Sequence, residues 1–201
     1  MVSFHSSVIS KITQVRELIN INRNIPLFFA MQGEGREWVE TFSKESREMF
    51  DYILTDVLTF HDHKERRTRL WVNNEVIIDI PEQEYMDMIM DRTLKALNEE
   101  PMNIWANPTL LGTVMMDDYD KYWTDERVAQ IIKVLKDNNI ALEINARYRL
   151  PNARIINAAK AAGVKFSLGT NNGQLNRLEY SLQMVEECGL TIDDMWFPTG
   201  Q

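Results

Sequence analysis

The C-terminal half of the chain alternates between short apolar runs and longer segments of helical periodicity, and this alternation constrains the fold most. Three apolar runs cover residues 103–108, 140–145 and 164–170. Between the first two, apolar residues recur at helical spacing, as at Val128, Ile131 and Leu135. Strands that alternate with helices through short connections predict a parallel sheet with right-handed crossovers.

The N-terminal half repeats this pattern less regularly. Its periodicity predicts strands at 25–32 and 51–58, and helices at 8–19, 43–50 and 82–98. Residues 67–80 are expected to form a hairpin that turns at Asn73-Asn74. Further helices are expected at 124–137, 152–162 and 175–188, the last two ending at Gly163 and Gly189. We expect residues 1–201 to form one α/β domain.

Charge and residue usage exclude several classes of protein. A single cysteine excludes an internal disulfide and the cysteine-rich zinc modules. A net charge of −8 disfavours nucleic acid as the partner. No segment reaches the ~18 consecutive apolar residues of a membrane span, so we expect no membrane insertion and a cytoplasmic location.

Polar residues follow each of the five expected strands at its carboxyl end. They are Gln32-Gly33-Glu34, Asp56, Asn107, Glu143 with Asn145, and Thr170-Asn171-Asn172. The carboxyl ends of parallel strands meet at one edge of the sheet, where α/β proteins bind their ligands. The sequence therefore predicts a binding site at this edge.

Four segments, in order, resemble the PHP (polymerase and histidinol phosphatase) superfamily over roughly residues 25–190. They are MQGEGREW (31–38), FDYILTDVLTF (50–60), NIWANPTLL (103–111) and ALEINARYRLPNARIINAAKAAGVKFSLGTNNG (141–173). The resemblance implies a distorted, TIM-like (β/α)7 barrel that binds up to three divalent metals and hydrolyses phosphoesters. With 201 residues the chain is shorter than the ~250 of a complete eight-stranded barrel.

The sequence departs from the superfamily's pattern where the metal ligands are expected. Leu58 and Asn107 stand where the pattern has histidines, and Asn171-Asn172-Gly173 stands in place of Asp-Ala-His. Of the matched positions, Glu34 alone keeps a metal-ligand type. The pattern's first two strands have no counterpart before residue 25. We therefore expect an incomplete barrel that lacks its N-terminal strands and has lost the metal cluster.

The nearest substitute for the missing histidines is His61-Asp62-His63. Side chains two residues apart in an extended segment point the same way, so His61 and His63 could chelate a metal together with Glu34. The alternative is a solvated loop, because Lys64 and further charged residues follow at once. Glu34 and Glu143 are the candidate catalytic carboxylates, the latter as a general base.

The remaining polar residues form the candidate ligand site. The set comprises Arg36, Asp56, Asn107, Asn145, Arg147, Asn171 and Asn172. Asparagine offers donors and acceptors without charge, which suits a small polar ligand, and arginine could clamp a carboxylate or phosphate. Ion pairing of these arginines with nearby glutamates is the alternative role.

Three functions compete. The preferred one is a PHP-like domain without its metal cluster and without a cofactor, non-catalytic or altered in activity, that binds a small polar or phosphorylated ligand. The first alternative is a Zn-, Mn- or Fe-dependent phosphoesterase that uses Glu34, His61, His63, Asp56 and Glu143. The second is a structural or assembly module, a homo-oligomer for instance, because an incomplete barrel exposes sheet edges.

Overall fold

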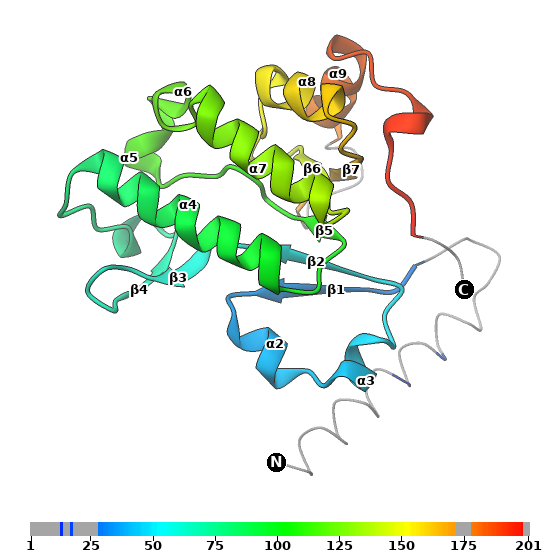
Figure 1. Cartoon of the computed structure of the whole chain (residues 1–201), viewed down its shortest axis with the longest axis horizontal. Coiled ribbons are helices and arrows are strands. Elements are labelled where there is room, and N and C mark those ends of the chain that lie inside the picture. The colour runs from blue at the N-terminus through cyan, green and yellow to red at the C-terminus, as the bar shows by residue number, and fades with distance from the viewer. Residues whose placement is uncertain (1–12, 14–16, 18–27, 172–177, 199–201) are drawn as a thin grey trace.

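The computed structural model describes residues 13, 17, 28–171 and 178–198, and its centre is a five-stranded parallel sheet (Figure 1). The strands are β1 (Ala30–Glu34), β2 (Tyr52–Asp56), β5 (Ile104–Trp105), β6 (Ala141–Asn145) and β7 (Phe166–Gly169). Their spatial order equals their chain order, and every neighbouring pair is parallel. The carboxyl ends of all five strands therefore lie along one edge.

Helices connect these strands. The longer ones are α4 (Glu82–Glu99), α7 (Asp125–Asp137), α8 (Ala153–Ala161) and α9 (Glu179–Glu187). Shorter ones are α2 (Glu37–Thr41), α3 (Lys44–Arg47), α5 (Thr113–Met116) and α6 (Tyr119–Tyr122), with 3-10 turns η1 (Asn73–Glu75) and η3 (Ile192–Asp194). In Figure 1, α4 and α7 lie on one side of the strands and α2 and α3 on the other.

Local sequence explains where the helices begin and end. The Thr124 side chain accepts a hydrogen bond from the Arg127 N–H at the start of α7, and Asn152 caps Ile155 in the same way in α8. Gly163 follows α8 with φ +78°, a conformation that favours glycine. The expected ends of these two helices are confirmed within one or two residues.

The main core lies between the sheet and the longer helices. Alternate strand residues point to opposite faces, and one face supplies apolar side chains that are at most 2% exposed, including Trp105, Leu142, Ile144 and Phe166. Helix α7 packs Ile131 and Leu135 into the same core. The strand residues of the opposite face are more polar, and they carry the candidate site.

The expected α/β class with an open sheet of parallel strands is confirmed. Strands β1 and β7 are the two edges of the sheet, which does not close on itself over the residues that the structure describes. Beyond β7, Met195 forms a single parallel bridge with Phe166. Trp196 then makes an edge-on ring contact with Tyr52 of β2, with ring centroids 5.3 Å apart.

The prediction for residues 67–80 was wrong. The antiparallel hairpin consists of β3 (Thr59–His61) and β4 (Arg67–Arg69), and the expected turn at Asn73 belongs to η1. The turn lies instead around Asp62, whose carboxylate accepts hydrogen bonds from the N–H groups of Lys64 and Arg66. A side-chain acceptor that binds two backbone donors favoured this turn over the Asn-Asn pair.

Strand β1 was also predicted too early, at 25–32 instead of 30–34, and helices α2, α5 and α6 were not expected. Of the expected 8–19 helix only Thr13 and Glu17 are described, and both are helical; the first residues of the expected 175–188 helix lie outside the described residues. No helix in the described part of the chain is long and apolar enough to cross a membrane.

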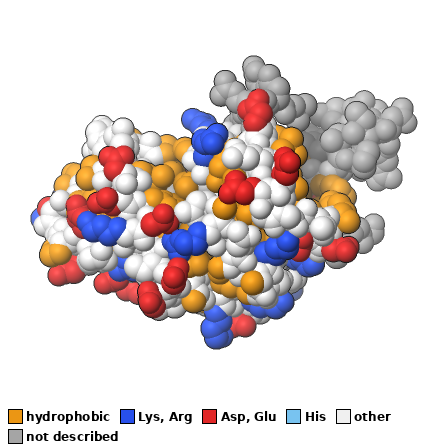
Figure 2. Space-filling view, turned by 90° about the horizontal axis from the view of Figure 1, so that it is seen from above, with side chains coloured by type: hydrophobic (Ala, Val, Ile, Leu, Met, Phe, Trp, Pro, Cys, Tyr) orange, Lys and Arg blue, Asp and Glu red, His pale blue; other side chains and the backbone are white. Residues whose placement is uncertain are grey.

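Figure 2 shows basic and acidic side chains interspersed with hydrophobic ones over one face of the molecule.

Candidate functional site

A pocket of about 240 Å³ opens on the polar face of the sheet, toward the carboxyl ends of its strands. All five strands or the residues that follow them line it. The lining comprises Gln32, Tyr52, Leu54, Ile104, Ala106, Asn107, Glu143, Ser167, Leu168, Gly169, Thr170 and Asn171. We call it the strand-end pocket. Its position is where parallel α/β sheets bind ligands.

Two buried carboxyl groups, Asp56 and Glu143, are joined through Asn107. The Asn107 amide Nδ2 donates to Asp56 Oδ2 at 3.3 Å, and its backbone N–H donates to Glu143 Oε2 at 2.6 Å. Each of the three residues is at most 6% exposed. One residue between two strands therefore places both acids in a single network.

Asn145, which is fully buried at the end of β6, completes this network. Its Nδ2 donates to Asn107 Oδ1 at 2.8 Å and to Glu143 Oε2 at 3.0 Å. Its Oδ1 accepts from the Tyr148 N–H at 3.0 Å. A buried side-chain amide needs hydrogen-bond partners. The hydrogen bonds among Asn107, Glu143 and Asn145 supply them, which explains why asparagine is tolerated at these buried positions.

The backbone around the strand-end pocket adopts conformations that only some residues tolerate. Asn107 has φ +47° and Asn171 has φ +46°, in the left-handed region that asparagine tolerates better than most residues. Gly169 leaves the space that Glu143 fills, because a Cβ atom there would lie 1.7 Å from Glu143 Oε1. The close approach of a carboxylate to backbone gives this glycine a defined role.

Burial raises the pKa of Asp56 to about 6. The hydrogen bond that Asp56 accepts from the Leu58 N–H lowers this pKa, but by less than burial raises it. The negative charge of Glu34 raises it further, whereas the amides of Asn107 and Gln32 lower it. Burial likewise raises the pKa of Glu143, although Asn145 and the Asn107 N–H stabilise its charge. Keeping such acids buried costs stability, which is typical of functional sites.

We expect the stability of the protein to fall as the pH rises from about 4 to 6. In this window the folded state still holds the Asp56 proton that the unfolded chain has lost, so deprotonation opposes folding, at a cost on the order of 2–3 kcal/mol. Urea unfolding at pH 4, 5, 6 and 7 measures this slope. Asp56→Asn should reduce this slope, and the same change at exposed Asp91 on α4 should not. An unchanged slope in Asp56→Asn would contradict the assignment.

The structure brings together only part of the expected ligand set. Asp56, Asn107, Asn145 and Asn171 converge on the strand-end pocket or its network, and Asn172 lies outside the described residues. Arg36 and Arg147 do not converge there. Arg36 pairs with Glu99 at 2.5 Å, a different partner from the acids expected, and Arg147 lies over the Tyr148 ring at 5.5 Å.

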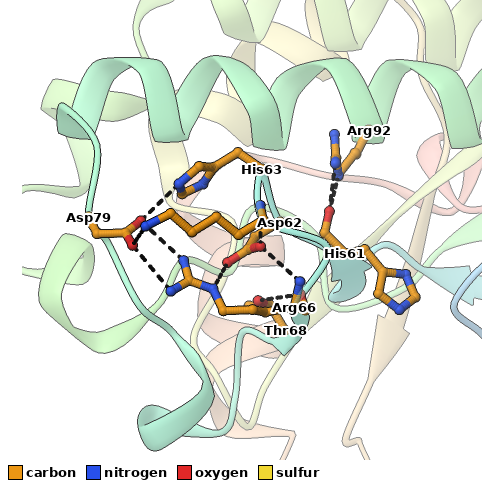
Figure 3. A network of polar contacts seen from close by, with 8 residues as sticks. His61, Asp62, His63, Arg66, Thr68, Asp79 and Arg92 are labelled. Carbon is orange, nitrogen blue, oxygen red and sulfur yellow. Dashed lines mark hydrogen bonds and ion pairs between the residues drawn. The ribbon is translucent and has the colours of Figure 1, made fainter.

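The expected chelating pair of histidines is not formed. Strand β3 ends at His61 and the turn begins at Asp62, so the two-residue periodicity does not extend to His63. In Figure 3 the His63 ring points toward Asp79 and the His61 ring points away from it. His63 Nε2 lies 2.9 Å from Asp79 Oδ1. The third expected ligand, Glu34, accepts a hydrogen bond from Thr59 Oγ1 at 2.8 Å.

The described side chains do not fit a histidine-rich metal cluster. No three His, Cys, Asp or Glu side chains gather closely enough to hold an ion in the described ranges. Leu58, where the PHP pattern places a histidine, is 5% exposed in the apolar core. At Asp56 and Glu143, amide and backbone N–H donors bind the carboxylate oxygens instead.

Sequence reasoning missed Gly169 and Tyr52 and left Gln32 out of the ligand set. Gln32 Nε2 donates to Asp56 Oδ2 at 3.4 Å, and Tyr52 lines the pocket. The signal for Gly169 was present, because a glycine within an apolar strand marks a close approach. Its partner, Glu143, is 26 residues away and is placed beside it only by the pairing of β6 with β7.

No protein-family model matches this chain, and no curated protein matches it. A solved structure does match: the crystal structure of histidinol phosphate phosphatase from Lactococcus lactis subsp. lactis Il1403, complexed with zinc, L-histidinol and phosphate. The match covers 89% of this chain and 73% of that one, with a TM-score of 0.60 and 14% sequence identity. At that identity the likeness concerns the fold.

Proposed function

We propose that this chain is a PHP-type domain that binds a small polar ligand in the strand-end pocket without the superfamily's metal cluster. Two independent lines support the fold assignment. Four sequence segments follow the superfamily's order, and a histidinol phosphate phosphatase shares the fold. The absence of a gathered metal-ligand set among the described residues supports a different use of the pocket.

One atom carries the ligand proposal, namely Glu143 Oε1. The hydrogen bonds that Glu143 accepts from Asn107 and Asn145 both go to Oε2, while Oε1 lies against Gly169 at the pocket wall. A ligand group that donates a hydrogen bond to Oε1 completes the network. Ammonium and hydroxyl groups are such donors, and an ammonium also offsets the negative charge of the buried acids.

A small amino alcohol therefore matches the pocket better than a bare anion. L-histidinol, which the solved neighbour binds, carries an amine and a hydroxyl group. A free phosphate would meet Asp56 and Glu143 with the same sign of charge. It would bind here only with a cation or with protonated carboxyl groups.

The test is calorimetric titration with L-histidinol near pH 7, with Glu143→Gln as the variant. Removing the charge that pairs with the ammonium should weaken binding at least about tenfold. Glu126→Gln, the same change at an exposed position of α7, is the matched control and should leave affinity unchanged. Equal affinity in wild type and Glu143→Gln would refute the proposed orientation.

The second candidate is a metal-dependent phosphoesterase, which the zinc and phosphate of the solved neighbour favour. A divalent ion would then lie against Asp56 and Glu143. Metal analysis of the purified protein, together with hydrolysis of L-histidinol phosphate in added Mn²⁺ or Zn²⁺, separates the two functions. Stoichiometric metal with turnover that Glu143→Gln abolishes would replace our proposal with this candidate.

A further inference from the structure

A second pocket, of about 290 Å³, lies outside the strand-end pocket, between α4, strand β3 of the hairpin and the start of α2. We call it the hairpin pocket. Its lining comprises Arg36, Glu37, Val57, Thr59, Phe60, His61, Arg92, Lys95 and Ala96. It shares no residue with the strand-end pocket. Neither the proposed function nor the fold accounts for it.

The charge of the hairpin pocket is opposite to that of the protein. Its lining carries three cationic side chains, Arg36, Arg92 and Lys95, and one acidic one, Glu37, in a chain of net charge −8. Glu99 pairs with Arg36, whereas no described carboxylate forms an ion pair with Arg92 or Lys95. Arg92 and Lys95 are therefore the two lining cations available to a bound anion.

Arg92 is held in place and still has donors to offer. Its Nε and Nη2 both donate to the His61 carbonyl, at 2.9 and 2.5 Å (Figure 3). Its guanidinium lies 5.6 Å from the centre of the Phe60 ring. Three of its five N–H groups remain after these two bonds. A positioned guanidinium binds oxyanions with less loss of entropy than a mobile one.

Helix α4 places the second cation beside the first. Arg92, Lys95 and Ala96 are spaced i, i+3 and i+4, so they share one face of the helix. Ala96 adds to an apolar floor formed by Val57 and Phe60. The pocket thus combines an apolar floor with a cationic rim.

We propose that the hairpin pocket binds a small organic anion, whose carboxylate or phosphoryl head pairs with Arg92 and Lys95 while its apolar body packs on Val57 and Phe60. The head lies between two cations on one helical turn, and the planar guanidinium forms paired hydrogen bonds with its oxygens. This site is independent of the strand-end pocket, so either proposal can fail alone.

The test is NMR titration of the full chain with phenylacetate and, separately, phenylphosphonate, which distinguishes a carboxylate from a phosphoryl head. Saturable shifts of the His61 ring signals are expected with at least one probe. Arg92→Gln/Lys95→Gln should weaken that binding at least about tenfold, because two charge-assisted contacts are lost. Lys95→Gln alone should weaken it less, and it leaves the Arg92 contacts with the hairpin intact.

Two control variants test whether the probes bind in the hairpin pocket. Lys133→Gln removes one charge from the exposed face of α7, where Lys133 pairs with Asp137, and should change nothing. Asp56→Asn alters the strand-end pocket and should also leave affinity unchanged. The proposal is overturned if neither probe binds, if both α4 variants bind like wild type, or if Asp56→Asn abolishes binding.

Discussion

Replacing Gly169 with alanine is expected to lower the free energy of unfolding by about 3 kcal/mol and to abolish ligand binding in the strand-end pocket. The new Cβ would lie 1.7 Å from Glu143 Oε1 and 2.5 Å from its Cδ, so the buried carboxylate must move. Its displacement breaks the hydrogen bonds from Asn107 and Asn145 in addition to the steric cost. Urea unfolding near pH 7 measures the loss.

A double variant distinguishes this clash from a general intolerance of β7 to substitution. Glu143→Ala alone leaves the donors of Asn107 and Asn145 unpaired and is itself destabilising. In Gly169→Ala/Glu143→Ala the clash is gone, so the combined loss should fall short of the sum of the single losses by more than about 1 kcal/mol. Ser167→Ala, on the same strand and pocket wall, should cost less than about 0.5 kcal/mol. Additive losses would contradict the assignment.

Asp62→Ala is the second substitution expected to have a large effect, again about 3 kcal/mol of unfolding free energy. Asp62 is 1% exposed. Its Oδ1 accepts from the N–H groups of Lys64 and Arg66, and its Oδ2 accepts from Arg66 Nε at 2.5 Å. Alanine would leave these donors without an acceptor at the turn that joins β3 to β4. Thermal and urea unfolding measure the loss.

Asp79→Ala is the matched control in the same cluster (Figure 3). Asp79 contacts His63, Lys64 and Arg66, but its side chain is 30% exposed, so solvent replaces much of what is lost. We expect a clearly smaller effect than for Asp62→Ala. If the two variants lose equal stability, the surface ion pairs and not the buried turn carboxylate hold the hairpin.

The hairpin also marks the limit of sequence-based prediction in the N-terminal half. The apolar alternation at 67–80 and the Asn73-Asn74 pair both favoured a turn that does not form. Leu70 instead donates its N–H to the Leu58 carbonyl and is 2% exposed, so tertiary burial pins β4 against the chain that follows β2. The local turn preference of Asn73-Asn74 therefore contributes less to stability than the burial of Leu70.

The sequence predicted which residues form the candidate site better than it predicted the hydrogen bonds and ion pairs between them. The rule that parallel strands present their carboxyl ends at one edge was enough to select Asp56, Asn107, Glu143 and Asn145. It could not show that Asn107 bridges two acids 87 positions apart in the chain, or that Arg36 turns away to Glu99. Those outcomes depend on side-chain contacts between elements that are distant in sequence.

The sequence by itself determined the strand and helix alternation, the parallel sheet and the polar character of its carboxyl edge. Periodicity and the handedness of crossovers are local or nearly local properties, so one chain suffices to infer them. Tertiary structure decided that Glu143 enters the space above Gly169, that His61 and His63 diverge, and that the hairpin and α4 enclose a cationic pocket. The first depends on strand register, the second on the turn at Asp62, and the third on packing between elements that are distant in the sequence.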